Sequence, residues 1–319
     1  MAQQNQTGVT ITIIGLGNMG GGMATNLLAR GYTVYAYDID ALKIDFYKKK
    51  GALTQVNPAL AAIKSIVTII CVVDAAQTRS VLFGSDGLAK RLRPGHTVML
   101  CPTIAPQDVE YCAAQLAQHG IHTIDAPMSG GPARATDGTM SLMVACTDAV
   151  YAQHQNLIHH LSSKVFRISQ HPGDGARTKL VNNLLAGINL VGAAEALALA
   201  QRMGLNLQTT LDVIQHSSGQ SWIGTDRMQR ALLGHTAPLA HMALLAKDTA
   251  LAVQAGHDTA AVASCAYSGP LGAQVSQLFA QALEAGFAEK DDSALLQWFL
   301  QPANVQLATP PQTSHLPTA

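Results

Sequence analysis

The feature that most constrains the fold is a glycine-rich turn close to the start of the chain. Residues 15–20 read GLGNMG; they directly follow the β-branched run VTITII and open an amphipathic segment that ends at Gly31, before a second β-branched run, TVYAY. This order predicts a βαβ unit whose turn and helix N-terminus bind the pyrophosphate of a dinucleotide through backbone N–H groups. A glycine turn without a ligand is the alternative. The cofactor-binding residues predicted here are Gly15, Gly17, Asn18, Met19 and Gly20.

The residue after the second run is Asp38. A carboxylate at this position accepts hydrogen bonds from the adenosine ribose hydroxyls, whereas a 2′-phosphate would meet a like charge, and no arginine occupies the next several residues. One charge-assisted hydrogen bond contributes roughly 1.5–3 kcal/mol, or one to two decades of preference. The sequence therefore favours NAD over NADP, with a simple turn cap as the alternative role of Asp38.

Further β-branched runs extend this pattern. They cover residues 66–73, 97–100, 121–125, 141–145 and 165–168, and helix-like segments lie between the first of them. Strands that alternate with helices build a mostly parallel sheet with helices on its faces. We therefore expect an α/β fold that begins with a Rossmann-type, doubly wound, mostly parallel sheet over residues 8–175.

The character of the chain changes after about Gly175. Residues 178–203 are nearly all Leu, Ala, Val, Ile, Asn and Gly, and no convincing strand follows before residue 299. A helix that is apolar all round is a buried helix. We expect a long buried interdomain helix, an all-α substrate and oligomerisation domain over residues 176–300, and a homodimer or homotetramer. The polar, proline-rich residues 301–319 predict a mobile tail.

Composition excludes several classes of function. The 319 residues include 20 lysines and arginines against 20 aspartates and glutamates, without a block of like charge, so neither a nucleic-acid nor a membrane-surface partner is indicated. No signal-peptide pattern and no apolar stretch long enough to cross a bilayer stands out, which predicts a cytoplasmic protein. The five cysteines form no CxxC pair and predict free thiols, mostly buried, and the scattered histidines predict no metal site. These observations favour a small-molecule partner.

Four motifs, in order, resemble the β-hydroxyacid dehydrogenase family, which includes 3-hydroxyisobutyrate dehydrogenase and tartronate semialdehyde reductase. They are the glycine turn with Met23, Ala24, Asn26, Leu27 and Gly31, then DAPMSGG at residues 125–131 with GTM at 138–140, then KLVNN at residues 179–183, and finally Lys247-Asp248. The resemblance spans nearly the whole chain, from Val9 to about Phe299. It implies an NAD-dependent hydroxyacid dehydrogenase that acts on CH–OH donors.

Within the family, several stretches are similar to the L-threonate dehydrogenase branch. Among them are Gly219-Gln220-Ser221-Trp222, Arg227-Met228 and Lys290-Asp291-Asp292-Ser293-Ala294. The branch implies oxidation of L-threonate to 2-oxo-tetronate, with 3-hydroxyisobutyrate dehydrogenase and tartronate semialdehyde reductase as alternatives. The chain departs from the family pattern at Pro102, which replaces a hydroxyl beside Thr103, and at Pro132, which stiffens the loop after Gly131.

Lys179 and Asn183 are the candidate catalytic residues. They are four residues apart and so project from one face of a helix, and a lysine on a buried helix is costly without partners. Oxidation of an alcohol requires removal of the hydroxyl proton. The resemblance assigns that proton to Lys179 and implies that Asn183 holds the substrate oxygen. Lys179 would then have to titrate well below the ordinary lysine pKa of about 10.4. An interdomain salt bridge or a snorkelling stem is the structural alternative.

The resemblance implies further site residues. Ser129, Gly130 and Gly131 offer a hydroxyl and approachable backbone N–H groups to a substrate carboxylate, although a glycine turn without a ligand would look similar. Trp222 either walls the substrate pocket or belongs to the core. The cofactor side is completed by Val73, Thr103 and Lys247, of which Lys247 contacts the cofactor or the substrate carboxylate.

Two competing interpretations remain. Imine reductases share this architecture, but they resemble the family with aspartate or tyrosine in place of Lys179. A non-catalytic nucleotide-binding protein would keep the glycine turn and lose the proton donor, whereas this chain retains both Lys179 and Asn183.

Overall fold

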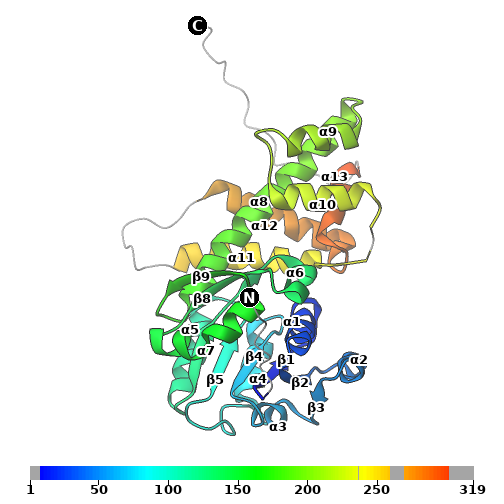
Figure 1. Ribbon diagram of the computed structural model, residues 1–319. Helices are drawn as coiled ribbons and strands as arrows, with labels where there is room; N and C mark the ends of the chain where they lie inside the picture. The colour runs from blue at the N-terminus through cyan, green and yellow to red at the C-terminus, as the bar shows by residue number, and fades with distance from the viewer. Residues whose placement is uncertain (1–7, 236, 259–268, 302–319) are drawn as a thin grey trace. The chain divides into compact units, whose positions relative to one another are not determined.

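The computed structural model describes residues 8–235, 237–258 and 269–301, which divide into two compact units (Figure 1). The described part of the first unit is residues 8–183 and 254–258, and that of the second is residues 184–235, 237–253 and 269–301. The division falls after Asn183, inside the long helix α8 (Asp174–Arg202). The predicted domain boundary at residue 175 stays a prediction. It lies in the same continuous helix, about two turns before this division.

A nine-stranded sheet runs through the described part of the first unit. The strands lie in the order β3-β2-β1-β4-β5-β6-β8-β7, and β9 pairs with β8. The pairs from β3 to β6 are parallel, β8 runs antiparallel to β6 and β7, and β9 is parallel to β8. The strands are β1 (Thr10–Ile14), β2 (Thr33–Tyr37), β3 (Leu53–Thr54), β4 (Val67–Ile70), β5 (Thr97–Leu100), β6 (His122–Asp125), β7 (Met128–Ser129), β8 (Ser141–Ala145) and β9 (Lys164–Ser169).

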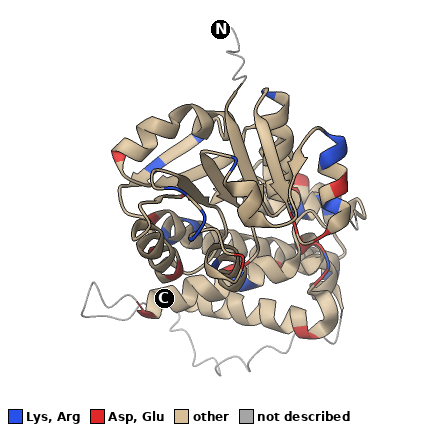
Figure 2. Ribbon diagram, turned by 90° about the horizontal axis from the view of Figure 1, so that it is seen from below, with Lys and Arg blue, Asp and Glu red and all other residues tan. Residues whose placement is uncertain are grey.

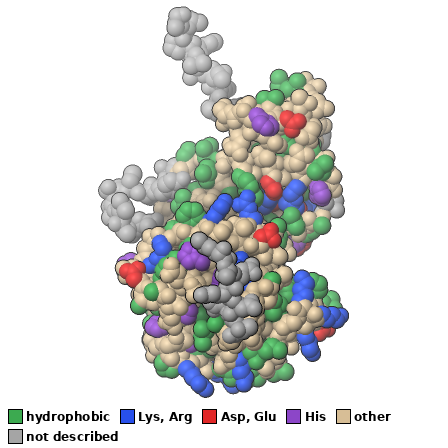
Figure 3. Space-filling model, viewed as in Figure 1, with side chains coloured by type: hydrophobic (Ala, Val, Ile, Leu, Met, Phe, Trp, Pro, Cys, Tyr) green, Lys and Arg blue, Asp and Glu red, His purple; other side chains and the backbone are tan. Residues whose placement is uncertain are grey.

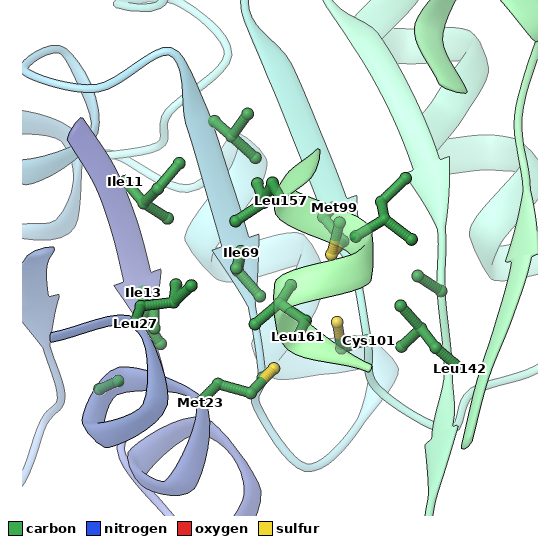
Figure 4. Packing of buried hydrophobic residues seen from close by; sticks show 14 of the residues in the cluster. Ile11, Ile13, Met23, Leu27, Ile69, Met99, Cys101, Leu142, Leu157 and Leu161 are labelled. Carbon is green, nitrogen blue, oxygen red and sulfur yellow. The ribbon is translucent and has the colours of Figure 1, made fainter. Parts of the chain in front are cut away.

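Helices cover both faces of this sheet, as the Rossmann-type prediction requires. On one face, Ile11 and Ile13 of β1 pack with Met23 and Leu27 of α1 and with Leu157 of α7 (Figure 4). On the other face, α3, α4 and α5 bury their apolar sides. The helices of this unit before α8 are α1 (Asn18–Ala29), α2 (Ala41–Lys49), α3 (Pro58–Ala62), α4 (Ala75–Phe83), α5 (Pro106–Ala117), α6 (Gly131–Asp137) and α7 (Asp148–Leu161).

The strand order places a switch point at β1. Its neighbours β2 and β4 lie on opposite sides of it, so the connections that leave β1 and β4 diverge above the carboxyl ends of these strands. Ligands of doubly wound sheets bind in the crevice at such a point. The glycine turn follows β1 directly and therefore lies at this edge of the sheet.

The described part of the second unit is helical, as predicted. Its core contains Leu190 of α8, Met228, Phe279 and Trp298. Arg227 and Arg230 of this unit form ion pairs with Asp292 and Asp291. The elements are the second part of α8, then α9 (Leu207–Gln215), α10 (Trp222–Leu232), most of α11 (Met242–Asp258), α12 (Pro270–Ala282), the π-helix η1 (Leu283–Phe287), the 3-10 helix η2 (Asp292–Ala294) and α13 (Leu295–Leu300).

Helix α8 corrects two expectations. The prediction that it is buried all round is wrong for the single chain, since Val181 is 71% exposed and Leu185 and Leu199 are each 58% exposed. The expectation that no stretch is long enough to cross a bilayer is also wrong, because α8 meets that criterion by length and composition. A core helix passes the same test, so one such helix is weak evidence for a membrane span.

The remaining composition-based expectations concern cysteines, charge and the tail. Cys101, Cys112 and Cys146 are buried free thiols and Cys71 is a half-buried one, while Cys265 lies outside the described residues. Lysines, arginines and acidic residues are interspersed along the ribbon (Figure 2) and on the face that Figure 3 shows. Of the predicted tail, residues 302–319 lie outside the described residues.

Candidate active site

The glycine turn joins β1 to α1, and two of its glycines are required by the protein itself. Gly15 has φ +93°, and a Cβ there would lie 2.4 Å from the carbonyl oxygen of Cys71. A Cβ on Gly20 would lie 1.9 Å from the carbonyl oxygen of Gly15. Both positions therefore exclude any side chain.

Gly17 is different, and it provides the test of fit for a dinucleotide. A Cβ on Gly17 would meet no atom of the described chain within 4 Å. Gly17 also precedes α1 without contributing a capping side chain, and the first turn of α1, which contains Asn18 and Met19, carries no acidic residue. Backbone N–H groups at such a helix start suit an anionic pyrophosphate, and a glycine lets that group approach closely. The residues of this turn therefore fit a dinucleotide.

Asp38 directly follows β2 and is tied to the glycine turn. Its Oδ2 accepts a hydrogen bond from the backbone N–H of Leu16 at 2.6 Å, and its Oδ1 accepts one from the N–H of Asp40 at 2.9 Å. The turn-capping role considered as an alternative is thus present. It leaves room for a second role, because each carboxylate oxygen can accept more than one hydrogen bond.

Val73 and Thr103 follow neighbouring strands of the same edge. Val73, which is 49% exposed, comes three residues after β4, and Thr103, which is half-buried, comes three residues after β5. Because β4 and β5 are parallel and in register, both residues lie at the carboxyl edge of the sheet, as does the glycine turn. The first unit thus places the predicted cofactor residues from positions 15 to 103 along one edge.

The predicted substrate loop connects β7 to α6. Ser129 pairs with Ser141 of β8, and Gly130 and Gly131 both have positive φ, +134° and +78°. A Cβ on Gly130 would also lie 2.9 Å from Cδ of Arg134. Backbone conformation alone therefore requires the two glycines, and their contact with a substrate remains a prediction.

Ser129 opens into a cavity of about 360 Å³ in the first unit. The cavity is bounded by polar groups of the substrate loop, β8 and α8 and by apolar side chains of β8 and β9, namely Ser129, Ser141, Met143, Phe166, Ile168, Thr178 and Asn182. Asn182 in turn donates a hydrogen bond to Oδ1 of Asn183 at 3.0 Å. A cavity of this size, mainly apolar but with a few polar groups, is large enough for a small organic acid.

Lys179 and Asn183 lie on α8, one turn apart, and both are buried, with 7% and 8% of their surface exposed. The helix continues unbroken through both positions, so the two side chains project from one face as predicted. A buried primary amine and a buried amide, one turn apart on a helix that also lines the cavity of Ser129, can hold an oxygen atom and move a proton to or from it.

Lys247 and Trp222 belong to the second unit. Nζ of Lys247 forms an ion pair with Oδ1 of Asp248 at 2.6 Å, and Asp248 is buried. Trp222 begins α10 and is 47% exposed. The guanidinium carbon Cζ of Arg227 lies 5.8 Å from the centre of the Trp222 ring. Trp222 is therefore not a core residue of the described chain, and its contact with a substrate stays a prediction.

The residues that resemble the threonate branch in the second unit form a buried ion-pair cluster. Nε of Arg227 lies 2.6 Å from Oδ1 of Asp292, and Nη2 of Arg230 lies 2.7 Å from Oδ2 of Asp291. Asp291 also accepts hydrogen bonds from the backbone N–H groups of Leu239 and Ala240. This part of the resemblance is explained by the internal structure of the unit, in which the cluster joins α10 to the segment before α13.

One buried carboxyl was not singled out from the sequence. Asp125, at the end of β6, is 1% exposed and accepts hydrogen bonds from the backbone N–H groups of Gly173 and Ala176. Burial raises its pKa to about 6, although the backbone N–H groups act in the opposite direction. The signal in the sequence is an indirect one: α8 starts after Gly173, without a Ser, Thr, Asp or Asn in the capping position, so a cap has to come from elsewhere.

Comparisons with known proteins agree with this geometry. Residues 10–169 match the family model of the NAD binding domain of 6-phosphogluconate dehydrogenase, and residues 173–299 match that of the NAD-binding region of NADP-dependent 3-hydroxyisobutyrate dehydrogenase. The chain is 35% identical to an L-threonate dehydrogenase of Cupriavidus necator over 91% of its own length and 95% of the relative. It is 31% identical to an NAD-dependent L-serine dehydrogenase of Pseudomonas aeruginosa, over 91% and 97%.

A solved structure is also similar. The crystal structure of a 3-hydroxyisobutyrate dehydrogenase from Salmonella typhimurium superimposes with a TM-score of 0.83 at 34% identity, covering 91% of this chain and 99% of that one. Imine reductases at about 20% identity share the fold alone, with TM-scores near 0.6.

Proposed function

The chain belongs to the 3-hydroxyisobutyrate dehydrogenase-like family of β-hydroxyacid dehydrogenases, and on that premise we propose that it oxidises L-threonate to 2-oxo-tetronate with NAD. Membership makes it an NAD-dependent hydroxyacid dehydrogenase; the identity of the acid is the proposal. The observation that carries the proposal is the pair of Lys179 and Asn183, buried one turn apart on α8, the helix whose Thr178 and Asn182 line the cavity of Ser129.

The cofactor side of the proposal uses the carboxyl edge of the sheet. The glycine turn would receive the pyrophosphate, Asp38 the adenosine ribose, and Val73 and Thr103 the rest of the dinucleotide. Lys247 is a further proposed contact on the family resemblance alone. NAD supplies the hydride acceptor when bound. No arginine follows Asp38 closely in the sequence, and the first cation after it, Lys43, is paired with Asp40 at 3.7 Å. Both observations support NAD over NADP.

The proton side of the proposal rests on Lys179. The hydroxyl proton has to leave as the alcohol carbon loses its hydride, and a neutral lysine within hydrogen-bond reach accepts it. Burial disfavours the charged form of a lysine, which is the direction that a base near neutral pH requires. Asn183 would donate its amide N–H to the same oxygen and keep it in line with Lys179.

The substrate side of the proposal rests on the loop of Ser129, Gly130 and Gly131 and, by the family resemblance alone, on Trp222. The loop would bind the carboxylate through the Ser129 hydroxyl and backbone N–H groups, and Trp222 would cover the carbon chain. The similarity to an L-threonate dehydrogenase over nearly the full length supports a four-carbon sugar acid. 3-Hydroxyisobutyrate and L-serine are the alternatives that other relatives suggest, and tartronate semialdehyde is the alternative that the sequence resemblance adds. We further infer a cytoplasmic homodimer or homotetramer, supported by the exposed apolar side of α8.

Initial rates of nicotinamide reduction test the proposal. The purified protein is offered L-threonate, D-erythronate, D-glycerate, 3-hydroxyisobutyrate and L-serine with NAD, and the best acid again with NADP. L-Threonate is expected to have the highest kcat/KM. A higher value for 3-hydroxyisobutyrate or L-serine would keep the reaction class and reject the acid.

Substitution of Lys179 tests the mechanism. Lys179→Ala is expected to lower kcat by about 10²–10⁴-fold, the usual contribution of a general base, and the remaining rate should lose its rise with pH. Lys90→Ala removes an exposed lysine of the same unit and should change neither quantity. Unchanged turnover in Lys179→Ala would reject this residue as the base.

A further inference from the structure

The start of α8 is capped by a side chain from a distant strand. Gly173, which precedes the helix, has no side chain and a φ of +108°. Oδ2 of Asp125 accepts hydrogen bonds from the backbone N–H of Gly173 at 2.8 Å and from that of Ala176 at 3.1 Å. The N–H groups of a first helical turn have no partner inside the helix. Asp125 therefore replaces the missing local cap, across 48 residues of sequence.

The fit of this cap depends on a second glycine. A Cβ on Gly175 would lie 2.9 Å from both Cγ and Oδ2 of Asp125, and 2.9 Å from the carbonyl oxygen of Met143. These distances are shorter than real Cβ contacts, so a side chain at 175 would force the helix away from β6 and β8. Close docking of α8 on Asp125 is thus a built feature of the fold.

The docked face of α8 is the face that carries the candidate base. Gly175, Lys179 and Asn183 follow one another at intervals of four residues, so they lie in one row along the helix. At 1.5 Å per residue, Lys179 lies about 6 Å along the axis from Gly175. A shift or rotation of the first turn on Asp125 is therefore passed on to Lys179 almost unchanged.

The backbone of Asp125 also lies close in sequence or sheet register to two other predicted parts of the site. It pairs with Leu100 of β5 in parallel register, and β5 leads directly into the segment of Thr103. Four residues after Asp125 the chain reaches Ser129 of the substrate loop. Asp125 is thus hydrogen-bonded to the start of the helix of the base and lies near the strand that precedes Thr103 and the strand that precedes the substrate loop.

We propose that Asp125 is a positioning residue: its ionised carboxylate holds the first turn of α8, and through it Lys179, in register with the substrate loop. This inference rests on the role of Lys179 in the proposed function. A carboxylate makes stronger hydrogen bonds to N–H groups than a neutral acceptor does, so loss of the charge weakens the hold without removing the acceptor atom.

The charge of Asp125 responds to pH in a useful range. Burial raises its pKa to about 6, the N–H groups of Gly173, Ala176 and Gly175 lower it, and the charge of Asp174 on α8 raises it. The thiols of Cys101 and Cys146, which follow β5 and β8, are the other titratable groups that sense this charge. We therefore expect kcat to fall on the acid side with an apparent pKa near 6.

Asp125→Asn separates positioning from stability. Asparagine keeps an acceptor oxygen and resembles the protonated acid, and because burial disfavours the charge, the Tm should stay the same or rise. The expected result is a kcat about 10–100-fold lower, as for a small misplacement of a catalytic group, a KM for NAD within twofold, and no acid limb near pH 6. Asp148→Asn is the matched control, because Asp148 lies in the first turn of α7, exposed and paired with Arg167 at 2.8 Å; it should retain the parent profile.

The readout uses the acid with the highest kcat/KM in the panel above, from pH 5 to 9, with Lys179→Ala measured beside it. A kcat within twofold of the parent in Asp125→Asn, or an acid limb that persists, would overturn the positioning role. Turnover retained in Lys179→Ala would instead reject the proposed function.

A second measurement is independent of the substrate. Hydrogen–deuterium exchange of the amides between residues 174 and 183, corrected for intrinsic rates, is compared at pH 5.0 and 7.5 in the unsubstituted chain and at pH 7.5 in Asp125→Asn. Faster exchange at pH 5.0 in the unsubstituted chain and at pH 7.5 in Asp125→Asn, each relative to the unsubstituted chain at pH 7.5, supports the role of Asp125 in holding the helix. Equal exchange in these samples rejects it.

Discussion

The proposed preference for NAD over NADP leads to a quantitative prediction for Asp38. Its two carboxylate oxygens accept hydrogen bonds from the N–H of Leu16 and the N–H of Asp40, at 2.6 and 2.9 Å. Asparagine in this position keeps one acceptor oxygen, enough to retain the shorter bond to Leu16, and it removes the negative charge. Asp38→Asn therefore preserves much of the turn while changing what the ribose would meet.

The expected size follows from these contacts. A hydrogen bond from a ribose hydroxyl to a carboxylate contributes roughly 1.5–3 kcal/mol, and about 1.4 kcal/mol corresponds to a factor of ten. The KM for NAD should rise about 10–100-fold in Asp38→Asn. The repulsion of a 2′-phosphate disappears with the charge, so kcat/KM for NADP should stay the same or rise, and the ratio of the two efficiencies should fall by at least about tenfold.

The assay compares kcat/KM for NAD and NADP with the same acid at saturation. Asp40→Asn is the matched control, because Asp40 caps α2 through the N–H of Leu42 at 2.9 Å and its side chain is 41% exposed. It should leave the cofactor ratio unchanged. If Asp38→Asn changed the ratio by less than twofold, Asp38 would be a turn cap only, and the cofactor preference would have to come from other residues.

Two further predictions concern stability. Burial lowers the pKa of His96 to about 4, and Nε2 of His96 forms a hydrogen bond with the Thr68 hydroxyl at 3.0 Å. Neutral His96 therefore stabilises the fold fully above the unfolded pKa of about 6.5, and this contribution is lost as the pH falls toward 4. In His96→Gln the free energy of unfolding by urea should lose up to about 3 kcal/mol of its change between pH 6.5 and pH 4, and an unchanged pH dependence would exclude His96 as its source. Arg227→Met removes the ion-pair partner of Asp292, which is 2% exposed, and should lower the free energy of unfolding by about 3–5 kcal/mol. The double variant Arg227→Met/Asp292→Leu should recover part of this loss. A loss below about 1 kcal/mol in Arg227→Met would show that the two charges are not coupled.

The fold could be predicted where burial leaves a local pattern. Strands β1, β4 and β5 are covered on both faces by helices, so nearly every position is apolar or β-branched, and such runs are visible in the sequence. Strands β3 and β7 were not predicted. Each has two residues, and each is a strand only because a neighbouring strand offers hydrogen bonds, which is information that no local pattern contains.

Residues of the candidate site could likewise be predicted where they leave a local pattern in the sequence, and not where their role depends on distant residues. Lys179 was noticed because an amine is unusual in an apolar helix, and the glycine turn because its spacing is distinctive. For Asp125 the sequence indicates only membership of a motif, since its role depends on N–H groups about 50 residues away, the nearer of them 48 residues along the chain. The exposed side of α8 was likewise missed, because apolar residues such as Val181 and Leu185 look the same in a sequence whether their partner lies in the same chain or is absent from it.

Helical geometry explains why an anchor at the start of α8 matters more than one in the middle. Thr178 and Asn182 line the cavity, while Lys179 and Asn183 occupy the row one residue further, about 100° around the helix at 3.6 residues per turn. A slip by one residue would therefore exchange the row of the base for the row of a hydroxyl and an amide. Hydrophobic contacts along an apolar helix are non-directional and resist such a slip weakly. Hydrogen bonds from two named N–H groups to one carboxylate are directional, so at the first turn they determine both the rotation and the translation of every residue that follows in the rigid helix.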